Sequence, residues 1–442
     1  MATSKMTVKQ PKSGLLERLF KLSEHNTDVK TEVLAGITTF MTLAYVIVVN
    51  PAILTAAGVP FGPSMTATIL TSIIGTLLMG LYANRPFAIA PYMGTNAFVA
   101  YTVIQGMGVS WETALGAIFV GGILFVLVTV TGIRKAIVDA TPAALKNGFA
   151  VGIGLFLTYV GLFNTGMVVS GDPVSIGDFT SRPVLLAVIG LILISILMVR
   201  KVKGALLIGI VLTTIVAIPL GVTQMPEKIF SLPPSIAEIA LNMDFIGVFS
   251  IGMLTVVFTL FLNDFLSTMG TLIGCAYKAG FLDENGNLPE IEKPMLADAI
   301  ATCVAALLGT TTAGTYVESA AGVEEGGRTG LTAVVTALLF AVTLLLSPIA
   351  EIIPNAATGP ALLIVGLLML SPIKEIDFDD YTEAIPAFIT IIMMSFTYNP
   401  AAGIAAGYII YPILQWFAGK GKNVHPINYI VALLCILYFV VL

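Results

Sequence analysis

Residues 309–330 read GTTTAGTYVESAAGVEEGGRTG, and apolar sequence flanks them closely on both sides. The glycine, threonine and serine content of this stretch disfavours a continuous spanning helix. A backbone that is broken at membrane depth is tolerated only where protein buries it or water reaches it. The stretch also holds Glu318, and an ionisable residue at such a depth indicates a functional site by default. We therefore interpret residues 309–330 as half of a substrate site.

The composition assigns the chain to the membrane proteins. Hydrophobic residues make up 57% of the 442 positions, charged residues make up 11%, and the mean hydropathy is +0.97. Soluble domains are roughly 45–50% apolar and about 25% charged. The three cysteines and two histidines show no metal or disulfide spacing. We expect an all-α membrane protein with the lipid bilayer around it, no cofactor, no metal and no nucleic-acid partner, and the chain offers no paired catalytic motif that would indicate an enzyme.

Uncharged runs near the length that spans a bilayer, about 17–25 residues, form two series of seven. The first series lies near 34–49, 64–82, 86–104, 113–131, 149–167, 183–199 and 204–221. The second lies near 247–274, 294–308, 310–326, 329–350, 356–372, 383–398 and 400–418. The third member of each series is interrupted by glycine, proline or threonine. Two interrupted segments at matching places are typical of transporters built from inverted repeats, with the binding site at the midplane.

This count predicts five parts of the chain. They are a cytoplasmic N-terminal segment with an amphipathic helix, the first repeat, a connecting segment, the second repeat, and a C-terminal tail. Their limits are 1–33, 34–222, 223–246, 247–418 and 419–442. The tail includes a short hydrophobic piece, 427–442, which we expect to lie along the membrane or to cross it only in part.

The positive charges give an independent check on this count. If the N-terminus is cytoplasmic and fourteen segments alternate, all of the 21 Lys and Arg residues except Arg182 and Lys228 fall on the inner side. Positive residues accumulate in cytoplasmic loops, and one miscounted segment would scatter them. The pattern therefore favours fourteen segments with the N-terminus inside, in a plasma membrane, which the short chain suggests is a bacterial inner membrane.

Three polar residues in apolar surroundings are candidates for the site. Asn96 follows Pro91 and Gly94 in the first interrupted segment. It could cap the short helix that follows, or its amide, which offers donors and an acceptor, could face a ligand. Both roles are compatible at the N-terminus of a half-helix.

The second candidate, Asp264, follows the long uncharged run 245–262. A carboxylate at the centre of such a run costs roughly 2.5–3.5 kcal/mol on insertion scales, so we interpret it as a reversible proton carrier. The alternative is a structural carboxylate satisfied by hydroxyls such as those of Ser267, Thr268 or Thr271. Asp298 could be a partner of Asp264 or an acid in the first turn of its own helix.

The third candidate is Glu318, in the second interrupted segment. It could be an acid that a helix dipole stabilises, or an acceptor for a ligand. Tyr316 lies two residues before it, and its ring could stack on a flat ligand or simply pack. We expect Glu324 and Glu325 to form surface ion pairs with nearby Arg328.

Four stretches together resemble the AzgA-like purine permeases of the nucleobase transporter class. They are FKLSEHNTDVKTEVLAGITTFMTLAYVIVVNP, APYMGTNAFVAYT, FLNDFLSTMGTLIG and TYVESAAGVEEGGRTGLTAV. The resemblance runs from about Phe20 to Phe417. Where this chain has Tyr92 and Thr95, members usually have glycine and leucine. Members also usually carry a DLFDT motif, and Ser267 replaces its second acid in this chain.

The resemblance implies a uracil-permease-like fold of fourteen segments, in which two inverted repeats form a core and a gate domain. It also implies that the third and tenth segments contribute short strands near the substrate, and that the activity is proton-coupled uptake of adenine, guanine or hypoxanthine. Carried over by position, it assigns substrate contacts to Asn96 and Glu318, and a binding or coupling role to Asp264. Thr95 adds a hydroxyl beside this site.

These expectations combine into one mechanism. A purine needs an acceptor for its N–H groups and a donor for its ring nitrogens or carbonyl, which Glu318 and Asn96 supply. Protonation of Asp264, with Glu318 as a second proton-coupling carboxylate, would let the proton gradient drive uptake by a rocking motion. The broad apolar face of the gate domain suggests a homodimer. The alternative is an exchanger or facilitator of the same fold for xanthine, urate or an inorganic anion, but two buried acids suit an anion poorly.

Overall fold

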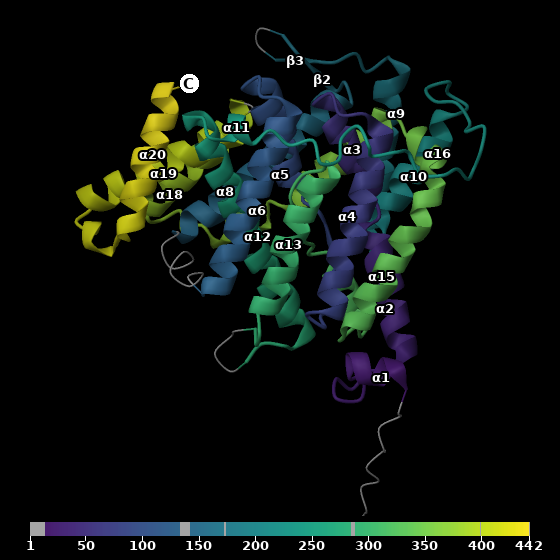
Figure 1. Ribbon diagram of the computed structural model, residues 1–442. Helices are drawn as coiled ribbons and strands as arrows, with labels where there is room; N and C mark the ends of the chain where they lie inside the picture. The colour runs from purple at the N-terminus through teal and green to yellow at the C-terminus, as the bar shows by residue number, and fades with distance from the viewer. Residues whose placement is uncertain (1–13, 133–141, 172–173, 284–287, 398, 442) are drawn as a thin grey trace, which may run out of the picture.

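The computed structural model describes residues 14–132, 142–171, 174–283, 288–397 and 399–441. These residues form a helical protein (Figure 1) in which eight helices are long and apolar enough to cross a membrane. Three shorter apolar helices accompany them: Ala205–Ala217, Tyr381–Phe396 and Ala402–Phe417. The chain is thus a multi-pass membrane protein.

The described helices and strands lie on either side of a long connection, 218–244. Those of the first half are α1 (Leu15–Phe20), α2 (Val29–Leu43), α3 (Val46–Ala56), α4 (Phe61–Leu81), β1 (Ile89–Pro91), α5 (Met93–Ala97), the π-helix η1 (Phe98–Gly106), α6 (Trp111–Thr131), α8 (Ala143–Asn164), β2 (Val168–Val169), β3 (Ser175–Ile176), α9 (Arg182–Val199) and α10 (Ala205–Ala217). Those of the second half are α11 (Phe245–Val248), α12 (Ile251–Ala279), α13 (Glu292–Leu308), β4 (Ala313–Thr315), α14 (Ser319–Glu324), α15 (Gly330–Thr343), η2 (Leu344–Leu346), α16 (Ser347–Glu351), α17 (Asn355–Leu368), η3 (Ser371–Glu375), α18 (Tyr381–Phe396), α19 (Pro400–Phe417), η4 (Gly421–Asn423) and α20 (Pro426–Val441).

Local sequence sets several of these boundaries. The side chain of Asp28 accepts a hydrogen bond from the Thr31 N–H at 2.9 Å and caps the start of α2. Asn399 caps α19 in the same way at 3.1 Å. Both satisfy an N–H that a helix leaves without a partner in its first turn. Gly280 ends α12 in a left-handed conformation at φ 70°, which glycine adopts without strain.

Some boundaries differ from those expected. The first segment is longer than 34–49, because α2 and α3 together run from Val29 to Ala56 with a break at Ala44 and Tyr45. The segment expected at 149–167 begins earlier, at Ala143, because α8 carries Lys146 within its first two turns. Uncharged runs therefore mark the apolar part of a helix and miss its charged end. Residues 426–441 form a complete helix, α20, packed on α19 and α12.

The two interrupted stretches meet in a small antiparallel sheet. Strand β1 pairs with β4, with Ala90 opposite Gly314 at the centre of the register. Beyond the strands, the Tyr92 N–H donates to the Thr312 carbonyl at 2.8 Å, and the Tyr316 N–H donates to the Ala88 carbonyl at 3.0 Å. Tyr92 and Tyr316 therefore occupy equivalent places, one after each strand. All residues of both strands are buried, as membrane-depth backbone outside a helix must be.

Helices pack around this sheet in two groups. The strand-side bundle comprises α2, α3, α4, α6, α12, α13, α14 and α15, which pack on one another and on the two strands. The flanking bundle comprises α8, α9, α10, α17, α18 and α19. In Figure 1, α18 and α19 lie at one edge of the molecule, far from α2 and α15 at the other.

Candidate functional site

Glu318 lies at the start of the short helix α14, directly after strand β4. Its Oε1 accepts a hydrogen bond from the Tyr45 hydroxyl at 2.9 Å. Tyr45 comes from the break between α2 and α3 and is 1% exposed. The other carboxylate oxygen, Oε2, is buried and has no hydrogen-bond partner among the described residues. A buried acceptor without a partner is costly, so this oxygen is available for a donor from outside the protein.

A pocket of about 500 Å³ lies against this carboxylate. Its wall comes from both bundles, since α17 faces the strand-side residues across it. The lining residues are Tyr45, Tyr92, Met93, Gly94, Thr271, Tyr316, Val317, Glu318, Val365, Leu368 and Met369. We call this the carboxylate pocket. An acid in a largely apolar, aromatic wall is the usual form of a small-molecule site.

A second pocket, of about 950 Å³, adjoins the first. Tyr92, Thr271 and Met369 line both. The remaining lining residues are Lys146, Asn147, Phe149, Ala150, Ile153, Asn263, Leu266, Ser267, Met269, Gly270 and Pro372. We call it the vestibule, because it lies between α8 and α12 and leads towards Lys146, on the side where the sequence predicts the cytoplasm.

Two tyrosine rings form part of the wall of the carboxylate pocket. The rings of Tyr92 and Tyr316 meet edge to face, with centroids 6.1 Å apart and an interplanar angle of 67°. The Tyr316 hydroxyl donates to the carbonyl of Pro91. A side chain on Gly314 would lie 3.3 Å from the Tyr92 ring, so glycine in β4 leaves room for that ring.

Asn96 is buried in a polar cluster behind the sheet. Its amide N–H donates to the side-chain oxygen of Asn50, and its amide oxygen accepts from Thr311. The Asn50 amide in turn donates to Thr68 at 2.7 Å and to Thr310 at 3.2 Å. Asn96 is fully buried and lines neither pocket. Its observed contacts join α3, α4 and α5 to the residues before β4.

Thr95 and Asp264 also lie behind the pocket wall. The Thr95 hydroxyl accepts from the Asn263 amide at 2.8 Å, which ties α5 to α12. Asp264 is 2% exposed, and its Oδ2 accepts from the Thr302 hydroxyl at 2.7 Å. Asp298 is fully buried, and its two oxygens accept from Thr268 at 2.5 Å and from Thr315 at 2.7 Å.

The structure therefore brings two of the five predicted site residues, Glu318 and Tyr316, to the carboxylate pocket. Substrate contacts by Asn96, Thr95 and Asp264 stay predictions. Tyr45 is a wall residue that the sequence argument missed, although it lies within the first resembling stretch. A tyrosine among aliphatic residues in a spanning segment was the available signal.

The expected pairing of Glu324 and Glu325 with Arg328 is wrong. Glu324 pairs with Lys278 at 2.7 Å, and Glu325 pairs with Lys203. The Arg328 guanidinium instead donates to the carbonyls of Val323 and Gly327 at 2.7 and 2.8 Å. Arg328 thus closes the end of α14, and the acids pair with two lysines that are distant in sequence, one in α12 and one between α9 and α10.

Comparison with proteins of known structure shows the fold. The transmembrane domain of the cyanobacterial bicarbonate transporter BicA superposes with a TM-score of 0.63 at 18% identity, covering 86% of this chain and 97% of that one. The murine Solute Carrier 26 family member A9 anion transporter, in an inward-facing state, superposes with a TM-score of 0.63 at 11% identity, covering 94% of this chain and 74% of that one. At such identities the likeness shows a common fold.

Comparison of sequences shows the family. A putative permease of Methanocaldococcus jannaschii is 49% identical over 97% of this chain and 98% of its own. The adenine permease AdeP of Escherichia coli is 41% identical over 97% and 96%, and the guanine/hypoxanthine permease PbuO of Bacillus subtilis is 40% identical over 94% and 98%. The pattern of the permease family matches residues 30–406. The chain therefore belongs to the permease family, as an AzgA-like member.

Proposed function

We propose that this protein is a secondary transporter that takes up purine nucleobases together with protons. The observation that carries the proposal is the buried, unpartnered Oε2 of Glu318 in an aromatic pocket. A purine supplies what this pocket lacks, because its ring and amino N–H groups are donors and its faces are flat and apolar. Similarity to adenine and guanine/hypoxanthine permeases over nearly the full chain supports the same substrate class.

The pocket suits a flat molecule for a geometric reason. Tyr45, Tyr92 and Tyr316 line it together with Val365 and Met369, so a planar ring can contact apolar surface while its edge reaches Glu318. Stacking and edge contacts with aromatic rings contribute about 0.5–1.5 kcal/mol beyond burial. A site built around one acceptor rejects molecules that leave that acceptor unpaired. Asn96 and Thr95 support this site by holding α5 in place.

For the architecture, we propose fourteen segments in two inverted repeats, 34–222 and 247–418, joined by 223–246. The equivalent hydrogen bonds after β1 and β4 support this symmetry. The strand-side bundle corresponds to the core and the flanking bundle to the gate. Rocking of one against the other would move the carboxylate pocket between the two sides of the membrane.

We also propose the orientation, location and assembly. The N-terminal segment 1–33 and the charged residues Lys420 and Lys422 face the cytoplasm of a bacterium across its inner membrane, and α20 of the tail packs against α12 and α19. Exposed apolar side chains on α9, such as Ile192 and Ile196, leave an apolar face on the flanking bundle that suits a homodimer or lipid.

Proton coupling is assigned to Asp264, with Glu318 as a second carboxylate that can take a proton. Asp264 is buried beside buried Asp298, and two nearby negative charges repel strongly in an apolar interior. Protonation of Asp264 from the outer side removes one charge and favours the loaded state. The inward proton gradient then drives accumulation.

The test is uptake of radiolabelled adenine and hypoxanthine into vesicles with and without an inward proton gradient. We expect accumulation of the unchanged base only with the gradient. Asp264→Asn should bind purine but fail to concentrate it. Concentrative, pH-dependent uptake by Asp264→Asn would contradict the proton assignment. Equal movement of the radiolabelled base with and without the gradient would favour an exchanger or facilitator. Competition by urate or bicarbonate would favour an anion substrate.

A further inference from the structure

One hydroxyl lies between a buried carboxylate and the backbone of the binding-site strand. The Oγ1 of Thr302, on α13, lies 2.7 Å from Asp264 Oδ2 and 2.8 Å from the carbonyl oxygen of Ala313. The Ala313 N–H donates to the same Oγ1 at 3.2 Å. Both Thr302 and Asp264 are almost fully buried. A hydroxyl has a single proton, so Thr302 donates either to Asp264 or to Ala313.

The backbone of Ala313 depends on this hydroxyl. In an antiparallel pair, successive residues turn their N–H and C=O alternately towards the partner strand and away from it. The bonds from Tyr92 to Thr312 and from Tyr316 to Ala88 cross to the other strand, so Ala313 between them faces α13. Among the described hydrogen bonds, Thr302 is the sole partner of the Ala313 carbonyl. A buried carbonyl without a donor is destabilising.

We propose that Thr302 is a positioning residue that links the protonation of Asp264 to the order of strand β4, and so to purine affinity. With Asp264 ionised, the Thr302 proton goes to the carboxylate and the Ala313 carbonyl lacks a donor. With Asp264 protonated, the carboxyl O–H donates to Thr302 Oγ1, and the Thr302 hydroxyl turns to Ala313. The hydrogen-bonding groups that join Asp264, Thr302 and Ala313 then all have partners, and β4 holds Tyr316 and Glu318 in place.

The first half of the chain contains the same cap without the acid. On α4, the Thr76 hydroxyl donates to the Ile89 carbonyl at 3.0 Å and accepts from the Ile89 N–H at 3.0 Å. No described hydrogen bond joins Thr76 to a carboxylate. Thr76 therefore fixes β1 at every pH, whereas Thr302 fixes β4 only when Asp264 holds a proton. Thr76 is a matched control within the same molecule.

The charges around Asp264 are consistent with this link. The titratable groups that interact with it are Asp298 and Cys303 of α13 and Tyr92. Asp298 accepts from Thr268 and Thr315, so it does not compete for the Thr302 hydroxyl. No Lys or Arg forms an ion pair with Asp264 in the described part of the chain.

The elements that pack on α12 bring little further charge to this point. The one charged residue of α6 is Glu112, in its first turn, and β4, α5, α11, α19 and α20 carry none. On α14, Glu318 faces the carboxylate pocket and Glu324 pairs with Lys278. The group that responds to protonation of Asp264 is therefore the neighbouring Thr302 hydroxyl and not a basic side chain.

The inference rests on the proposed function, and its test is purine affinity against pH. Purified protein would be titrated with radiolabelled adenine and hypoxanthine from about pH 5 to about pH 8. We expect the wild type to bind more tightly as pH falls. Thr302→Val should bind about tenfold more weakly at low pH, the ratio that one buried hydrogen bond supports, and should lose the pH dependence. Thr76→Val should also bind more weakly but keep the pH dependence of the wild type.

Two further variants separate the possible failures. Thr302→Ser keeps the hydroxyl and should restore the pH dependence, which guards against a folding defect in Thr302→Val. Asp264→Asn should bind tightly at every pH. If Thr302→Val keeps the pH dependence of the wild type, the proposed role of Thr302 is wrong. The same holds if Thr302→Val and Thr76→Val both lose the pH dependence. In either case the proposed function itself is unaffected. A wild type that binds no purine overturns the proposed function and with it this inference. An Asp264→Asn protein that keeps its pH dependence overturns the assignment of the proton to Asp264, and this inference with it.

Discussion

The two oxygens of the Glu318 carboxylate have different surroundings. Oε1 accepts from Tyr45 at 2.9 Å, while Oε2 is buried without a described partner. Because one oxygen is held and the other is free, the carboxylate is oriented before a ligand arrives. Such preorganisation reduces the entropy lost on binding. The selectivity of the pocket should therefore depend on this single free acceptor.

Glu318→Gln tests this arrangement. The amide replaces one acceptor by a donor, so either Tyr45 or the purine N–H loses its partner. We expect purine affinity to fall about 10–100-fold, the range for a hydrogen bond to a charged group, with little change in thermal stability. Equilibrium binding of radiolabelled adenine measures the effect. Glu324→Gln, on the same helix but exposed, is the control and should bind like the wild type.

We expect Tyr92 to limit the size of the ligand that the same pocket accepts. Its ring lines both the carboxylate pocket and the vestibule. In Tyr92→Ala we expect the carboxylate pocket and the vestibule to merge, so purines with bulky substituents should compete for uptake in this variant and not in the wild type. A competition panel against adenine uptake measures this change. Tyr82→Ala, at an exposed site, should leave the panel unchanged, and an unchanged panel in Tyr92→Ala would assign the limit to another residue.

At the scale of elements, close contact between small residues holds the site in position. α14, which directly follows Glu318, packs against α2 through Gly322. A Cβ at Gly322 would lie 2.1 Å from the Thr39 hydroxyl and 2.6 Å from the Ala35 carbonyl. Small residues allow this approach of helices in membrane proteins. The position of Glu318 is thus a property of the α2–α14 contact.

Gly322→Ala should disturb that contact. Overpacking of this kind costs about 1–3 kcal/mol, so we expect a lower thermal midpoint in detergent and weaker purine binding. Gly274→Ala, in α12, is the matched control, since a Cβ there meets no atom within 4 Å and Gly274 lines neither pocket. Equal thermal midpoints for the two alanine variants would show that α14 can shift without cost.

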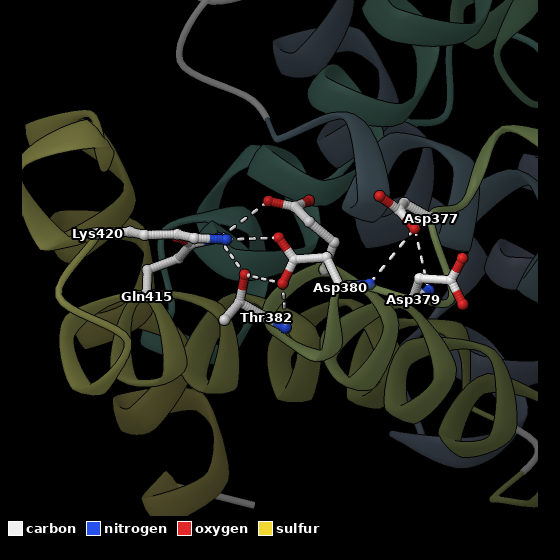
Figure 2. Close-up of polar contacts among 7 residues, drawn as sticks. Asp377, Asp379, Asp380, Thr382, Gln415 and Lys420 are labelled. Atoms are coloured by element: carbon white, nitrogen blue, oxygen red, sulfur yellow. Dashed lines mark hydrogen bonds and ion pairs between the residues drawn. The ribbon is translucent and has the colours of Figure 1, made fainter.

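An ion pair joins α18 to the end of α19 (Figure 2). Lys420 Nζ lies 2.6 Å from Asp380 Oδ2, and the Gln415 amide donates to Thr382 at 3.1 Å. Lys420 and the hydrogen bonds from Thr382 lower the pKa of Asp380 from an ordinary 3.8 to about 2. A lowered pKa stabilises the folded protein above the ordinary value, and this contribution is lost as pH falls from 3.8 towards 2.

Lys420→Met should therefore be less stable than the wild type at neutral pH, and the difference should disappear as the pH approaches 2. Exposed pairs contribute little, so we expect a small shift in thermal midpoint, reduced further by salt. Midpoints measured in detergent against pH give the result. Lys422→Met is the control. A difference that persists in strong acid would mean that the lysine acts through packing.

At the scale of the molecule, the helices end at two opposite sides of the protein. Figure 1 shows α1 at one end of the molecule and β2, β3, α11 and α16 at the other. Lys201 lies between α9 and α10, and Lys228 lies in the long connection before α11. The proposed orientation places Lys201 inside and Lys228 outside, in agreement with the bias of positive residues to the cytoplasm.

Cysteine labelling tests this orientation. With a membrane-impermeant maleimide, Lys228→Cys should react in intact cells and Lys201→Cys only in inverted vesicles. The native cysteines are buried or partly buried, so the unmodified protein measures the background. Labelling of Lys201→Cys in intact cells would reverse the proposed orientation.

The sequence by itself determined the membrane class and the places where two segments break, and it indicated Glu318 as a candidate site residue. Composition, glycine and threonine content, and a charge in apolar surroundings are local properties, so they can be read without coordinates. Only the tertiary structure showed that Tyr45 holds Glu318, that the Asn96 amide turns towards Asn50 and Thr311, and that Thr302 joins Asp264 to β4. These contacts link distant parts of the chain, and the direction of a side chain depends on how the helices pack around it.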